Sequence, residues 1–171
     1  MRFCDIFRVS SGQDNRHTGN RLPRCRHLIA RRRTLAEQTS SLSEMLPIEL
    51  RIGNETLDEQ HDKLFCRIEA LKTAAFGDSG ISVIALRECA TAFAIHFADE
   101  EGLAKAAGIE FLVHRNEHAK ALRLFDKALR EIERGKLDQH SFLRYIEYWF
   151  EHHITEHDKR LASRLTDKAS H

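Results

Sequence analysis

Histidines and acidic residues recur at helical spacing in several segments of this 171-residue chain. His96 and Glu100 are four residues apart, and so are His114 and His118. Residues four apart on an α-helix lie on the same face, about 6 Å apart along the axis, so the members of each pair point the same way. Imidazole and carboxylate groups bind several divalent transition metals in proteins. The spacing therefore predicts a metal site between helices.

Two further segments supply similar side chains. DEQH at residues 58–61 ends in His61, and WFEHHITEHD at residues 149–158 contains His153 and Asp158. His157 competes with Asp158, because it follows His153 by four residues, whereas a spacing of five leaves about 140° between side chains on a regular α-helix. If His153 and Asp158 share a site, we expect a local widening of the helix such as a π-bulge.

The candidate set contains five imidazoles and two carboxylates. Its members are His61, His96, Glu100, His114, His118, His153 and Asp158. The set has no thiolate and too many ligands for one tetrahedral ion, which disfavours a structural zinc site. The mixture suits two iron or manganese ions, and two bridging carboxylates plus a bridging oxygen would leave one coordination position open. A ferritin-like di-iron site requires Glu-x-x-His on two helices, and the sequence contains no such motif.

Apolar periodicity and glycine-containing turns predict four helices after a short extended lead-in that begins at Leu46. We expect them at about 55–76, 81–107, 113–134 and 138–165, with Gly108 and Gly135 ending two of them and Asp138 capping the last. The predicted inward positions of the first three helices are Leu57, Leu64, Phe65, Ile68 and Leu71; Ile84, Leu86, Phe93, Phe97 and Leu103; and Leu122, Phe125, Leu129 and Ile132. Short loops between helices of this length predict an all-α fold, an up-down-up-down antiparallel four-helix bundle with the metal site in its core.

A change in composition divides the chain near Met45. Residues 1–44 contain nine arginines, no lysine and four acidic residues, whereas the other 127 residues contain 18 basic and 22 acidic ones. We expect a basic, disordered extension at 1–44 and a bundle domain at 45–171. A tail that binds nucleic acid or an acidic surface and a targeting peptide are alternatives for the extension. An incidental extension, with Met45 as the true start, is the interpretation we favour.

The composition also limits the location of the protein and its partners. No apolar run approaches the roughly 20 residues of a membrane span, and the bundle segment has no basic excess that would favour nucleic acid. The four cysteines show no paired spacing typical of a disulfide framework or a zinc site. We therefore expect a cytoplasmic protein without a membrane partner.

The segments DEQH, HFADEE, HRNEH and WFEHHITEHD together resemble the hemerythrin family, specifically its single-domain bacterial members, over about residues 46–165. The resemblance implies two iron ions joined by an oxo or hydroxo bridge, with dioxygen as their ligand. It implies that His114, His118 and His153 bind the coordinatively full iron, and that His61 and His96 bind the iron with the open position. Glu100 and Asp158 would bridge the two ions.

The family register places the last histidine before an isoleucine and five residues before the aspartate. His153, Ile154 and Asp158 fit this register, whereas His152 and His157 do not. The lead-in MLPIELRIG departs from the family pattern, because it lacks the usual aromatic residue.

Apolar residues are predicted to surround the open position. They are Leu64, Phe97, Trp149, Phe150 and Ile154. A dry pocket is what reversible dioxygen binding requires, since water or acid would release a reduced oxygen species. The expected function is thus a non-enzymatic, non-haem di-iron protein that carries, stores or delivers dioxygen. The alternatives are an oxygen or redox sensor acting through a partner, an iron-handling protein, and a di-iron oxidoreductase that reduces peroxide, nitrite or nitric oxide. The last would need proton delivery, with His157 or Glu101 as candidates.

Overall fold

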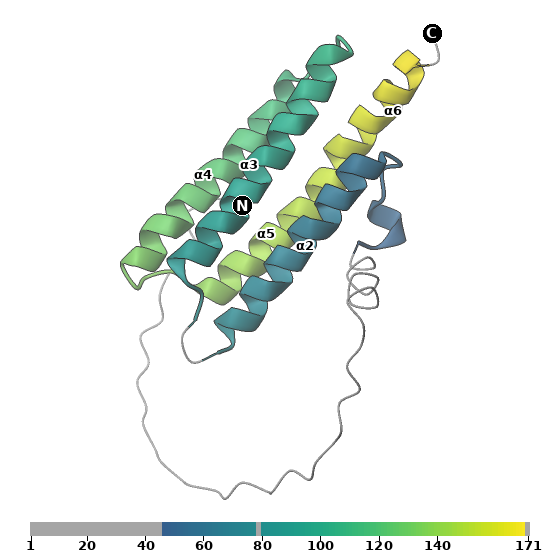
Figure 1. Cartoon of the computed structure of the whole chain (residues 1–171). Coiled ribbons are helices and arrows are strands. Elements are labelled where there is room, and N and C mark those ends of the chain that lie inside the picture. The colour runs from purple at the N-terminus through teal and green to yellow at the C-terminus, as the bar shows by residue number, and fades with distance from the viewer. Residues whose placement is uncertain (1–45, 78–79, 170–171) are drawn as a thin grey trace, which may run out of the picture. The chain divides into compact units, whose positions relative to one another are not determined.

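The computed structural model describes residues 46–77 and 80–169, and the regular elements in these ranges are all helical (Figure 1). A short 3-10 helix, η2 (Ile48–Leu50), precedes four long helical stretches. These stretches are α2 (Glu55–Ala75), α3 (Val83–Ala106), α4 (Leu112–Glu133), and α5 (Gln139–His153) continued by η3 (Ile154–Asp158) and α6 (Lys159–Ala169). The predicted extension at 1–44 and Met45 lie outside the described residues.

Three helices begin at a polar capping residue, and two end at a glycine. Asn54, Ser82 and Asp138 cap the N-termini of α2, α3 and α5 by accepting a hydrogen bond from a backbone N–H in the first turn. Gly108 and Gly135 follow α3 and α4 with φ of 64° and 65°. This left-handed conformation favours glycine, and it allows the next N–H to bond back into the last helical turn. The predicted stops and the Asp138 cap are confirmed.

The four long helices pack side by side, with their apolar faces inward. Helix α2 contacts α3 and α5, α4 contacts the same two helices, and α3 also contacts α6. All five predicted inward residues of α2 are buried. Phenylalanines fill much of the centre, since Phe93 contacts the rings of Phe97, Phe125 and Phe150. The result is a helical bundle with an aromatic core.

Parts of the predicted core are wrong in α3 and α4, and Leu103 of α3 is only half-buried, next to the completely buried Ala104. Ile84, in the first turn of α3, is 71% exposed, whereas Leu86 two residues later is completely buried, so the inward face of this turn includes Leu86 and not Ile84. In α4 the fully buried apolar positions are Ala121, Leu124, Phe125 and Ala128, whereas the predicted Leu122, Leu129 and Ile132 are half-buried. Small alanines occupy the centre of this face because α3 and α4 pack closely there, and the larger residues flank it.

The lead-in is bound to α2 by buried and surface acids instead of by an aromatic residue. Asp58 accepts hydrogen bonds from the N–H groups of Ile52 (2.8 Å) and Gly53 (3.1 Å), and Asp62 accepts one from Leu46 (2.7 Å). The predicted extended lead-in is only partly correct, since Leu50 donates to Pro47 O and closes the 3-10 turn.

The last helical stretch widens between His153 and Asp158. Residues Ile154–Asp158 form the π-helical segment η3, and Lys159 N–H donates to Ile154 O five residues back. The expected widening is therefore present at the expected place. Within the described residues, no helix combines the length and apolar character required to cross a membrane.

Candidate metal centre

The seven candidate residues lie together in the bundle interior. Their side chains come from all four helical stretches, and every one of these residues is at most 7% exposed. They are His61 from α2, His96 and Glu100 from α3, His114 and His118 from α4, His153 from the end of α5, and Asp158 from η3. Because histidine, glutamate and aspartate are rarely buried without partners, this concentration of polar groups requires an explanation.

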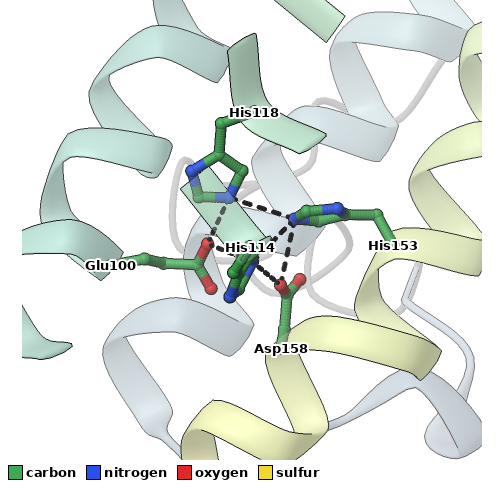
Figure 2. A group of neighbouring side chains, drawn as sticks. All are labelled: Glu100, His114, His118, His153 and Asp158. Atoms are coloured by element: carbon green, nitrogen blue, oxygen red, sulfur yellow. Dashed lines mark hydrogen bonds and ion pairs between the residues drawn. The ribbon is translucent and has the colours of Figure 1, made fainter. Parts of the chain in front are cut away.

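Five of these residues form a group on one side of the cluster (Figure 2). The Nε2 atoms of His114 and His118 lie 2.9 Å and 3.1 Å from His153 Nε2. Glu100 Oε2 lies 3.1 Å from His118 Nε2, and Asp158 Oδ1 lies 2.9 Å from His114 Nε2. Three imidazole nitrogens and two carboxylate oxygens thus converge on one small volume.

A second group shares both carboxylates with the first. His61 and His96 join Glu100 and Asp158 there, and the four potential ligand atoms lie within 4.8 Å of one another. The two oxygens of Asp158 divide between the groups, with Oδ2 at 3.4 Å from His61 Nε2 and Oδ1 at 3.2 Å from His153 Nε2. Each group can hold a metal ion, and two ions bound in this way would share Glu100 and Asp158.

The hydrogen bonding of the cluster supports this interpretation. Nine buried side-chain nitrogen and oxygen atoms of these residues have no hydrogen-bond partner among the described residues, including both oxygens of Glu100 and of Asp158. The short imidazole–carboxylate contacts of Glu100 and Asp158 therefore lack hydrogen-bond geometry, whereas the two contacts of His153 Nε2 with His114 and His118 have it. Buried polar atoms without hydrogen bonds destabilise a fold. The convergence of so many nitrogen and oxygen lone pairs therefore fits a site that binds cations. The donor set of imidazole and carboxylate, without thiolate, fits iron or manganese.

The electrostatic environment keeps the imidazoles available as ligands. Burial, and then the neighbouring His61, lower the pKa of His96 to about 3. Burial and the neighbouring His153 lower the pKa of His118 to about 2. Both rings are therefore neutral near pH 7, and a neutral imidazole has one nitrogen lone pair to offer a metal. Burial and the adjacent Asp158 raise the pKa of Glu100, which reflects the cost of holding two carboxylates together without a cation.

Aromatic rings cover both groups. The Phe150 ring lies edge-on to His61 and His96 at centroid distances of 5.5 Å and 6.2 Å, beside the two-histidine group. Phe97 stacks on His118 at 3.9 Å, and half-buried Trp149 stacks on His153 at 4.7 Å, beside the three-histidine group.

The predicted pocket residues are thus distributed over both sides of the cluster. Phe97 also contacts His96 at 5.7 Å, so it borders both groups, while Trp149 faces the three-histidine group. Leu64 and Ile154 are almost completely buried, at 2% and 0% exposed. Four of the five predicted pocket residues are therefore in the dry core, and Trp149 is at its edge.

Two contacts of the cluster could not be predicted from the sequence. Gln60 Oε1 lies 2.9 Å from His96 Nδ1, and the Phe111 ring lies 4.3 Å from that of His114. Neither contact has a sequence signal, because each joins side chains whose proximity depends on the packing of the whole bundle.

His157, the sequence competitor of Asp158, is half-buried. Its ring lies 5.1 Å from that of His153, but it is in neither ligand group.

Comparisons of the chain with protein-family models, with curated proteins and with solved structures found no match.

Proposed function

We propose that this chain is a hemerythrin-like, non-haem di-iron protein that binds dioxygen reversibly and serves as a carrier, store or local supplier. The observation that carries the proposal is the pair of buried ligand groups that share Glu100 and Asp158. His114, His118 and His153 would hold one iron, and His61 and His96 would hold the other.

We also infer an up-down-up-down antiparallel order for the helices. Residues 76–82, 107–111 and 134–138 connect successive helices, and such short connections support a reversal of direction at each turn. The contacts of α2 with both α3 and α5 support the same order.

The two groups differ in their number of histidines, and this difference supports binding of an external ligand such as dioxygen at only one of the two metal ions. The group of His61 and His96 has one imidazole fewer than the other group, which leaves room for an external ligand on that side. When bound, two ferrous ions would offer two electrons and one open coordination position, which is the chemistry that dioxygen binding requires.

Apolar side chains of the protein surround the two-histidine group. Phe150 lies against both His61 and His96, while Leu64 and Ile154 are buried in the surrounding core. An apolar wall limits the access of water and protons, and this favours release of unchanged dioxygen over its reduction.

One observation favours a second candidate, a di-iron oxidoreductase. A surface cavity of about 590 Å³ is lined by His114 and His157, so solvent approaches the three-histidine group. On α3, Glu101 Oε1 lies 3.6 Å from His118 Nδ1, and the Glu101 side chain is 37% exposed. Both His157 and Glu101 are placed to pass protons toward the cluster, which an enzyme needs and a carrier does not.

The visible absorption spectrum of the iron-loaded full-length chain separates these functions. It is recorded under argon, then in air, then under argon again, together with an iron count. The proposal predicts two irons per chain and a colour that appears in air and fades under argon. Two irons with one irreversible colour change would favour the oxidoreductase, and a chain without iron would contradict both functions.

A further inference from the structure

The side-chain amide of Gln60 joins His96 to a surface carboxylate. Gln60 precedes His61 on α2, and its Oε1 lies 2.9 Å from His96 Nδ1 on α3. The Nε2 atom of the same amide donates to Asp99 Oδ2 at 2.6 Å. His96 is only 1% exposed, whereas Asp99 lies at the surface. The amide therefore connects a buried ring to a charged group at the edge of the bundle.

Asp99 determines which way the amide points. A carboxylate only accepts hydrogen bonds, so the NH₂ group of Gln60 must face it. The flipped amide would place its oxygen against the carboxylate, which leaves two acceptors in contact. The amide oxygen of Gln60 consequently faces His96, and this oxygen also only accepts.

The orientation of Gln60 specifies the proton on His96. Because Gln60 Oε1 cannot donate, His96 Nδ1 must carry the hydrogen of this 2.9 Å bond. A neutral imidazole has one N–H, so the lone pair is then on Nε2. Among the described residues His96 Nε2 has no hydrogen-bond partner, and it lies 3.8 Å from Glu100 Oε2, in the two-histidine group.

We infer that Gln60, oriented by Asp99, is a positioning residue that holds His96 in its Nδ1–H tautomer and so presents the Nε2 lone pair to a metal ion. The role in metal binding rests on the proposed function, while the tautomer follows from the protein contacts alone. Groups that hydrogen-bond the outer nitrogen of a ligating histidine orient the ring and increase metal affinity.

The tautomer is measured by nitrogen-15 NMR of histidine-labelled, metal-free full-length chain near neutral pH. We expect His96 to be protonated on Nδ1 in the wild type and to show a mixture of tautomers in Gln60→Leu. Asp99→Ala, which frees the amide to rotate, should move His96 toward the same mixture. Asp99→Asn, whose amide can donate as well as accept, leaves both orientations of Gln60 possible and should give a mixture too. A wild-type His96 protonated on Nε2, or a Gln60→Leu signal identical to wild type, would overturn the inference.

Metal affinity, measured by chelator competition, provides a second readout. Gln60→Leu should weaken the affinity for one of the two ions by about 10–100-fold. The control Asp126→Ala, an exposed aspartate on α4, should leave the affinity unchanged. Circular dichroism establishes that each variant is folded.

The two readouts separate the inference from the proposed function. A wild type that binds no metal would refute the di-iron function, while the NMR result would still decide the tautomer. A changed tautomer with unchanged metal affinity would overturn the positioning role of Gln60.

Discussion

At the scale of single residues, Glu100 contacts three histidines that come from two helices of the bundle. Its Oε2 atom lies 3.8 Å from His96 Nε2, 3.5 Å from His114 Nε2 and 3.1 Å from His118 Nε2. It therefore faces histidines of both ligand groups. If two ions occupy these groups, Glu100 is a ligand shared by both, and its removal affects each of them.

Replacement of Glu100 by alanine should reduce the iron content from two ions per chain to one or none, because a single change removes a ligand from each ion. Iron is counted after purification and reloading under argon. Glu88→Ala is the matched control, since Glu88 is an exposed glutamate on the same helix. Full loading of Glu100→Ala would contradict the bridging role.

Replacement of Leu64 by glutamine should increase the rate of irreversible oxidation by roughly tenfold or more, because a polar group brings water next to His61. Leu71→Gln is the control, since Leu71 is equally buried on α2 but about 15 Å from His61 along the helix axis. Both variants should lose roughly 1–3 kcal/mol of stability. Equal oxidation rates in the two variants would show that Leu64 does not protect the site.

At the scale of elements, η3 brings Asp158 onto the same side as His153. Five residues separate them, and on a regular α-helix their side chains would differ by about 140°. The i to i+5 hydrogen bond from Lys159 N–H to Ile154 O accommodates one additional residue in this turn. As a result, the part of the helix beyond η3 keeps Leu161 and Ala162 in the core.

Deletion of the exposed Thr155 should therefore be tolerated. The spacing from His153 to the aspartate becomes four, so a regular α-helix now places both on one face. We expect two irons per chain and a cooperative unfolding transition in this variant. Insertion of one alanine after Thr155 should have the opposite effect and reduce iron binding, because it rotates Asp158 and the following turn away from the core. Loss of iron in a folded deletion variant would show that the π-helical geometry itself is needed.

The sequence predicted the elements better than it predicted their faces. The helix boundaries depend on local signals such as the Asp138 cap and Gly108, and these were recognised correctly. The predicted inward positions of Ile84 and Leu122 are wrong because exposure depends on how each helix is rotated against its neighbours and on how closely α3 and α4 pack. Neither property is encoded in the periodicity of one helix.

The candidate site was predictable for a related reason. Residues four apart on a helix share a face, so the spacing of His96 and Glu100, and that of His114 and His118, predicts that the members of each pair point into the same site. The contact of Gln60 with His96 and Asp99 joins two helices and was not predictable, because it depends on the rotation of α2 against α3.

At the scale of the whole molecule, the buried cluster makes the metal-free fold sensitive to acid. The pKa values of His96 and His118 fall to about 3 and about 2, against about 6.5 for an exposed histidine. Below pH 6.5 the unfolded chain therefore binds more protons at these residues than the folded chain, so the free energy of unfolding decreases as the pH falls. The raised pKa of Glu100 acts in the opposite direction, but it is one group against four, because burial also lowers the pKa values of His114 and His157.

Urea unfolding of the metal-free full-length chain between pH 7.5 and 5.5 measures this effect. Below pH 6.5 we expect a loss of roughly 1 kcal/mol or more per pH unit. This loss of stability follows from proton binding and not from a change in the surface exposed on unfolding. The dependence of the free energy of unfolding on urea concentration should therefore stay the same at each pH. A stability that stays constant or rises toward pH 5.5 would contradict the burial of neutral imidazoles.

The central claim is that two iron ions share Glu100 and Asp158 in the core of the bundle. X-ray absorption spectroscopy of the iron-loaded full-length chain tests this claim most directly. We predict a first shell of nitrogen and oxygen without sulfur, and scattering from a second iron at roughly 4 Å or less. A sulfur ligand, or iron-loaded chain without an iron–iron signal, would contradict the account.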